Sequence, residues 1–253
     1  MFFFGKNKKQ ETRQNLPQSF WIEDLEIDTG SWIQVYSACL GKMTAIQNAF
    51  GEQVVKGDWT VSFSEGVISF GGPSYPIQFI GSESNVSNTW LWAWENVNRF
   101  PDRLLQLAGR AKEIGMRWKL DPFLPAKFEL DQSFNGHAMS VALCGLMDKY
   151  CYYRCPHAQG AAFVAISGVP DSVFAPVDAQ TFASITMQCI ERPIDHKLFI
   201  EGFLTWNRTK YEWDGQTIIA HFPDELRIEF ETIEGFRRIK ALRGLKAAPA
   251  PES

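Results

Sequence analysis

The 253-residue sequence lacks any apolar run long enough to cross a membrane, which argues against a membrane-spanning protein. Its first residues, 1–9, place apolar side chains before basic ones, the reverse of the order in a secretory signal. The five cysteines form no dense framework, which is typical of a reducing compartment where thiols stay free. We therefore expect a cytoplasmic protein that makes no membrane contact.

Familiar catalytic and cofactor signatures are also missing. The sequence contains no D-x-D or H-E-x-x-H pattern and no serine nucleophile elbow. Glycine pairs such as Gly71-Gly72 lack the strand, loop and helix context that phosphate binding requires. These absences predict no cofactor and favour a binding protein over an enzyme.

One local cluster offers metal-ligand residue types: Cys151, Cys155 and His157. Structural zinc sites need four converging ligands, usually from two Cys-x(2–4)-Cys pairs, and no second pair follows here. A Cys155 nucleophile activated by His157 is also disfavoured, because two residues with a proline between them rarely direct both side chains to the same point. We predict no metal site, and we interpret the segment as a helix end packed on a sheet.

The charge is unevenly distributed. The net charge is −4, but basic residues concentrate in 1–13 and 237–246, so the body between them is more acidic than the total. An acidic body argues against a nucleic-acid-binding surface. We interpret the two basic ends as solvated termini.

Aromatic residues are abundant, with 20 Phe and 9 Trp. Trp90, Trp92 and Trp94 occupy alternate positions, which places three indoles on one side of a strand. Leu91 and Ala93 make the other side apolar as well. A strand that is apolar on both sides belongs inside a sheet with other elements packed on each face. We therefore predict a central, structural strand.

Hydrophobic periodicity predicts the remaining elements. A first helix begins at a capping box formed by Ser31 and Gln34 and ends at Gly51. Short turns over 58–96 predict a four-stranded antiparallel meander. The further predictions are helices over 101–115 and 136–150, strands over 128–131, 161–166 and 182–190, a helix capped by Asp195, and three strands over 211–242. The predicted fold class is α+β, with an antiparallel meander packed against several amphipathic helices.

The predicted domain organisation is simple. Residues 1–28 form a polar N-terminal lead-in, and residues 29–246 form a single α+β domain. Pro170 and Pro176 mark a possible internal boundary near 169–180. Residues 247–253, rich in alanine and proline, are expected to be a disordered tail.

Two blocks carry a resemblance to a known family. The first is the Trp strand over 89–96, and the second is Tyr152-Tyr153-Arg154 followed by Pro156. Together they resemble a bacterial family of uncharacterised proteins, a domain of unknown function, over about residues 30–245. The resemblance implies no activity and no catalytic residues, and the chain has Cys155 and His157 where the family pattern suggests other residues.

Two functions remain open. The first is a non-catalytic module whose curved, aromatic-lined sheet holds a small ligand or a protein segment. Its candidate binding residues are Trp90, Trp92, Trp94, Glu95, Tyr153, Arg154 and His157. The alternative is a hydrolase-like enzyme in which Glu95, Arg154 and His157 meet only in the fold. A pocket where a carboxylate and a histidine come within hydrogen-bond reach would favour the enzyme. The sequence does not predict the oligomeric state.

Overall fold

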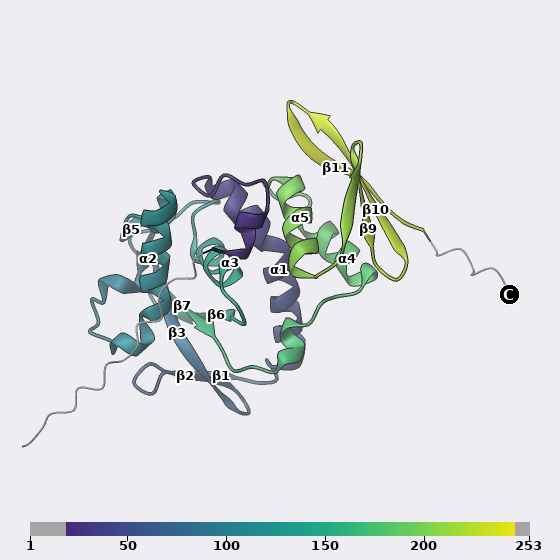
Figure 1. Cartoon of the computed structure of the whole chain (residues 1–253). Coiled ribbons are helices and arrows are strands. Elements are labelled where there is room, and N and C mark those ends of the chain that lie inside the picture. The colour runs from purple at the N-terminus through teal and green to yellow at the C-terminus, as the bar shows by residue number, and fades with distance from the viewer. Residues whose placement is uncertain (1–18, 246–253) are drawn as a thin grey trace, which may run out of the picture.

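The computed structural model describes residues 19–245, in which five α-helices pack with two antiparallel sheets. The predicted α+β class is therefore confirmed. Figure 1 shows α1 near the centre, with the larger sheet on one side and the smaller sheet on the other. The helices are α1 (Trp32–Gln53), α2 (Gln106–Trp118), α3 (Gly136–Leu146), α4 (Ala179–Cys189) and α5 (His196–Trp206).

The larger sheet has seven strands organised around β3 (Ser74–Ser84). The first four strands follow one another antiparallel, which confirms the meander predicted over 58–96. They are β1 (Trp59–Ser62), β2 (Val67–Phe70), β3 and β4 (Thr89–Trp92), and β5 (Lys127–Glu129) pairs with β4. On its other side β3 pairs with β7 (Gly160–Ile166), which pairs with β6 (Cys151–His157).

The Trp strand lies inside this sheet, because β4 is flanked by β3 and β5. Trp90 and Trp92 are fully buried. The strand ends at Trp92 and a 3-10 turn follows, so Trp94 leaves the alternation and stacks on Trp92 at 4.6 Å between ring centroids. The prediction of an interior strand is therefore confirmed for its first half.

A single side chain of α1 covers the outer edge of β6. Gln47 accepts a hydrogen bond from the Tyr152 backbone N–H at 3.0 Å, and its amide nitrogen donates to the Tyr152 carbonyl at 2.9 Å. The side-chain amide thus replaces a neighbouring strand. This contact satisfies backbone groups that would otherwise invite pairing with another chain.

The start of α1 differs from the predicted capping box. Ser31 occupies the N-cap, but its side chain accepts no hydrogen bond from the helix. Gln34 instead accepts from the Asp28 backbone N–H at 2.7 Å, and the Asp28 carboxylate accepts from the Gly30 N–H at 2.9 Å. The Gln34 side chain therefore binds the turn before the helix and does not form the predicted capping box with Ser31.

Helices α1 and α5 pack closely against each other because α1 has a glycine, Gly41, at their contact. A Cβ added at Gly41 of α1 would lie 2.6 Å from the Cβ of Phe203 on α5. No larger residue fits there without separating the helices. Beyond α5 lies the four-stranded sheet, in the order β11–β10–β9–β8. Its strands are β8 (Tyr211–Asp214), β9 (Thr217–His221), β10 (Glu225–Ile233) and β11 (Phe236–Leu245).

Three sequence predictions are wrong in this half of the chain or near it. The strand predicted over 182–190 is the helix α4, whose buried side chains Phe182, Ile185, Thr186 and Cys189 follow helical spacing. Its N-cap Asp178 accepts from the Thr181 N–H at 2.8 Å. Four strands replace the three predicted over 211–242. The segment 151–157, interpreted as a helix end, is the strand β6, and α3 already ends at Leu146.

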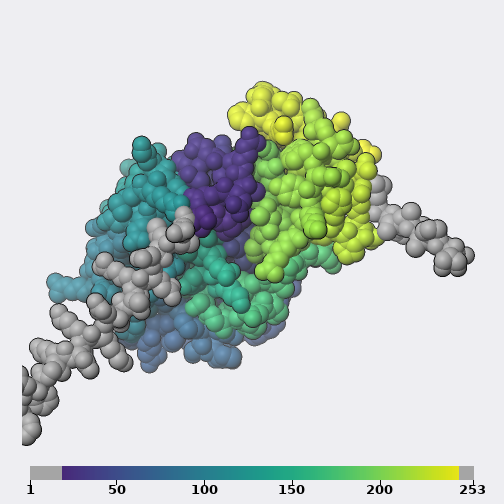
Figure 2. All heavy atoms as spheres, in the orientation of Figure 1, coloured from purple at the N-terminus to yellow at the C-terminus, as the bar shows by residue number. Residues whose placement is uncertain are grey.

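Part of the predicted lead-in belongs to the folded body. Phe20 and Ile22 are buried, and the backbone over 21–24 forms a 3-10 turn. Figure 2 shows the purple N-terminal part of the described chain between the teal elements and the yellow-green C-terminal part. Residues 1–18 and the predicted tail over 247–253 lie outside the described residues.

One continuous cluster of buried side chains joins both sheets and all five helices, and it runs across the proposed internal boundary near 169–180. The single-domain division stays a prediction. Across residues 19–245, each helix is too short or too polar to span a bilayer.

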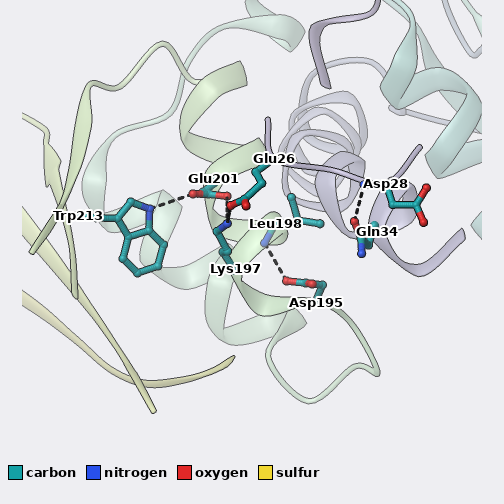
Figure 3. A network of polar contacts seen from close by, with 8 residues as sticks. All are labelled: Glu26, Asp28, Gln34, Asp195, Lys197, Leu198, Glu201 and Trp213. Carbon is teal, nitrogen blue, oxygen red and sulfur yellow. Dashed lines mark hydrogen bonds and ion pairs between the residues drawn. The ribbon is translucent and has the colours of Figure 1, made fainter. Parts of the chain in front are cut away.

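A polar network that runs from exposed Glu26 to buried Glu201 fixes α5 between the N-terminal turn and the smaller sheet (Figure 3). Lys197 forms ion pairs with Glu26 at 2.6 Å and with Glu201 at 3.9 Å. The Trp213 indole N–H of β8 donates to Glu201 at 2.9 Å. Glu201 is buried, and this burial raises the pKa of its carboxyl group.

Two substitutions at Glu201 separate its charge from its hydrogen bond. We expect Glu201→Gln to retain the wild-type free energy of unfolding at pH 7, because the amide still accepts from Trp213 and removes a buried charge. Glu201→Ala leaves the indole N–H without its acceptor and should cost about 2 kcal/mol. Urea unfolding of both variants measures this. An equal loss in the two variants would show that the ion pair with Lys197 is the stabilising contact.

Candidate functional site

A cavity of about 220 Å³ lies where α1 and the α3–β6 loop meet the segment before α4 and the end of α5. We call it the junction pocket. It is lined by Lys42, Ile46, Asp148, Lys149, Phe174, Pro176, Trp206 and Arg208. A smaller cavity of about 20 Å³ beside Trp92 and Asn96 has room for about one water molecule.

The floor of the junction pocket contains a buried lysine. Lys42 is 4% exposed, and its Nζ donates to the carbonyl oxygens of Gly145 and Met147 at 2.8 and 2.7 Å. These carbonyls lie at the C-terminal end of α3, where unpaired oxygens carry negative partial charge. Burial lowers the pKa of Lys42. A charged ammonium has three N–H groups, and two of them are used by these carbonyls. The Nζ also lies 5.5 Å from the centroid of the Trp21 ring.

The rim is exposed and carries both signs of charge. Lys149 is partly engaged, since its Nζ lies 2.8 Å from Asp171. The side chains of Arg208 and Asp148 form no hydrogen bond or ion pair with any residue in the described range 19–245. Both of these groups are therefore available to a ligand.

The backbone at Arg208 fixes where its side chain starts. The Arg208 N–H donates to the Thr205 carbonyl at 3.1 Å, and the Thr209 N–H donates to the Leu204 carbonyl at 3.0 Å. This pair of bonds closes the end of α5 as a Schellman motif, with Arg208 at a φ of 58°. Glycine is preferred at such a left-handed position, so arginine is held there at a conformational cost.

Between floor and rim the wall is apolar. It is formed by Ile46, Phe174, Pro176 and Trp206. The pocket thus combines three basic side chains and one carboxylate with apolar surface. Such a lining can hold a small acidic ligand through its charged groups and bury the ligand's carbon skeleton.

The predicted aromatic site residues lie away from this pocket. Trp90 and Trp92 are in the core, and Trp94 is half-buried against Trp92. Tyr153 of β6 packs against the ring of Trp59 at 5.8 Å. The described structure therefore uses these rings for packing, and ligand binding by them stays a prediction.

The predicted polar site residues are not joined to one another. Glu95 is exposed in the turn after β4. Arg154 forms an ion pair with Glu83 at 3.7 Å, and the Nδ1 of exposed His157 accepts from the Gln159 backbone N–H at 3.3 Å. No hydrogen bond or ion pair links the three within the described chain, and their role stays a prediction.

The structure brings together pocket residues that the sequence analysis did not select. They come from four segments, and no spacing pattern relates them. One signal was present: Lys42 falls three residues after Cys39 and four before Ile46, within the apolar stripe of α1. A charge in a buried helical stripe needs partners there, which marks it as a candidate.

Histidine and cysteine chemistry lies outside the junction pocket. His221 of β9 approaches Glu212 of β8 at 3.8 Å, and both side chains are exposed. All five cysteines are free and buried, and burial raises the pKa of the Cys151 and Cys155 thiols to about 12. Such thiols are poor nucleophiles at neutral pH. Over residues 19–245, no three Cys, His, Asp or Glu side chains are grouped as metal ligands.

Comparison with known proteins places the chain in a family. A model described as a family of unknown function, DUF6882, matches residues 33–169. No curated protein and no solved structure matches the chain. The match includes Lys42, Ile46, Asp148 and Lys149, whereas the other half of the pocket lining follows it in the sequence. Because the model covers more than half of the chain, this protein belongs to the family of unknown function DUF6882.

Proposed function

We propose that this protein is a non-catalytic binding module that holds a small acidic ligand in the junction pocket. The observation that carries the proposal is the charge of the lining. Three basic side chains face one carboxylate there, in a protein whose net charge is −4. A local excess of positive charge on an acidic protein attracts and retains small anions.

The depth of the pocket supports a specific site over a general anion surface. Lys42 is buried and its ammonium position is set by two carbonyl oxygens. A preorganised donor loses little freedom when a ligand binds. Lys149 and Arg208 at the rim then supply charge that guides the ligand inward.

The lining also favours binding over catalysis. The described pocket residues include no histidine, serine or cysteine, and its one carboxylate has no histidine partner. General acid–base catalysis and nucleophilic catalysis usually depend on such pairs. The geometry thus supports a site that holds its ligand without converting it.

A pair of glycine substitutions tests the pocket. Arg208→Gly removes the guanidinium and relieves a left-handed residue, so the protein should stay at least as stable as wild type. We expect affinity for small carboxylic acids to fall at least tenfold, since a charge-assisted contact is lost. Titration calorimetry on the full chain measures the affinity, and thermal shift screens the acids.

Lys119→Gly is the matched control. Lys119 is an exposed basic residue at the end of α2 with a φ of 56°, and it lies outside the junction pocket. Its substitution should leave affinity unchanged. Equal affinities in the two variants would show that the acids bind elsewhere. Turnover in a hydrolase screen that is abolished by changing Glu95, Arg154 or His157 would instead establish the enzyme.

A further inference from the structure

Asp148 is an unexpected residue in a pocket that attracts anions. It is the one acidic side chain that lines the described junction pocket, and it repels any acidic group nearby. Its neighbour Lys149 pairs with Asp171 and leaves Asp148 without an ion-pair partner in the described chain. Asp148 favours the charged form of Lys42 by Coulombic attraction. It repels a simple anion, however, whereas a ligand that also carries a positive group is attracted to it.

The rim offers two complementary groups that do not neutralise each other. Arg208 presents a guanidinium, whose paired N–H groups match a carboxylate. Asp148 presents a carboxylate, which matches an ammonium group. No ion pair joins the two side chains in the structure over residues 19–245. The rim is therefore complementary to a zwitterion.

Below the charged rim, the pocket wall is apolar, and Lys42 lies at the bottom. Trp206 and Ile46 provide apolar surface, and the buried lysine forms the floor. A cavity of roughly 150 Å³ holds benzene, so about 220 Å³ has room for about nine non-hydrogen atoms. This size suits a short carbon chain whose far end reaches Lys42.

We infer that the junction pocket binds a free amino acid whose side chain ends in an acid or amide. The α-ammonium group lies on Asp148, the α-carboxylate lies on Arg208, and the terminal oxygen of the side chain accepts a hydrogen bond from Lys42. This inference rests on the proposed function and narrows its ligand. The apolar wall contacts the methylene groups between the two ends.

Three five-carbon probes separate the recognised groups: L-glutamate, glutarate, which lacks the ammonium, and L-norvaline, which lacks the side-chain acid. Titration calorimetry on the full chain should show glutamate binding at least tenfold tighter than either of the others. Asp148→Asn should weaken glutamate about tenfold and leave glutarate unchanged or tighter, because the repulsion of its acid disappears. Asp58→Asn, which changes an exposed carboxylate outside the junction pocket and away from its lining residues, is the matched control and should leave the glutamate-to-glutarate ratio unchanged.

The outcomes distinguish this inference from the proposed function. Glutarate binding as tightly as glutamate, with Arg208→Gly weakening both, overturns the amino acid as ligand and retains the acid-binding pocket. If norvaline bound as tightly as glutamate, Lys42 would not recognise the terminal acid of the ligand's side chain, and that part of the inference would be wrong. If none of the three probes binds, the amino-acid inference fails, and the proposed function fails with it unless another small acid binds in an Arg208-dependent manner.

Discussion

Replacement of Trp92 by alanine is expected to lower the free energy of unfolding by about 4 kcal/mol. The Trp92 side chain is fully buried and contacts the rings of Trp90, Trp94 and Phe123 at centroid distances of 5.4, 4.6 and 5.1 Å. Its indole N–H donates to the Pro122 carbonyl at 2.9 Å. The substitution removes these contacts together and leaves a cavity between β4 and the connection after α2. For a protein of this size the melting temperature should fall by roughly 10 °C.

Two further variants identify the cause of this loss. Trp94→Ala, at the half-buried neighbour, should cost only about 1 to 2 kcal/mol, since less apolar surface is lost. Trp92→Phe keeps an aromatic ring and loses the hydrogen bond, so its stability should lie between wild type and Trp92→Ala. Unchanged melting temperatures in Trp92→Ala and Trp94→Ala would mean that the indoles are exposed. A ligand platform on the Trp strand would then become the better account.

Lys42→Met is expected to cost about 2 kcal/mol of stability and to abolish binding in the junction pocket. The Met147 carbonyl has no other donor among the described hydrogen bonds, so the substitution leaves a buried acceptor unsatisfied. The Gly145 carbonyl is less affected, because it also accepts from the Trp21 indole at 3.0 Å. Loss of a positive charge at the C-terminal end of α3 lowers the stability by a further, smaller amount.

Urea unfolding and titration calorimetry measure the two effects of Lys42→Met separately. Lys56→Met is the matched control, since Lys56 is exposed just after α1 and lies outside the junction pocket. It should change stability by less than about 0.5 kcal/mol and leave affinity intact. If Lys42→Met bound small acids with wild-type affinity, Lys42 would not contribute to the binding site.

Local patterns predicted the elements well where one period dominated. The helix after Ser31 and the meander over 58–96 were correct, because an apolar repeat of 3.6 or 2 residues is a property of the segment itself. The region of α4 was misread as a strand although Phe182 and Cys189 keep helical spacing. Its β-branched residues favour strands, and packing against the rest of the core decides the helix.

The sequence by itself determined the fold class, the interior position of the Trp strand and the acidic character of the body. Each depends on residues close together in the chain or on composition alone. Only the tertiary structure decided the junction pocket, because Lys42, Asp148 and Arg208 are far apart in sequence and meet through the packing of α1 against α5. The ion pair between Arg154 and Glu83 and the contact of Gln47 with the edge of β6 were likewise visible only in the tertiary structure. Contacts of this kind depend on how helices and strands pack, and a one-dimensional spacing pattern does not record that arrangement.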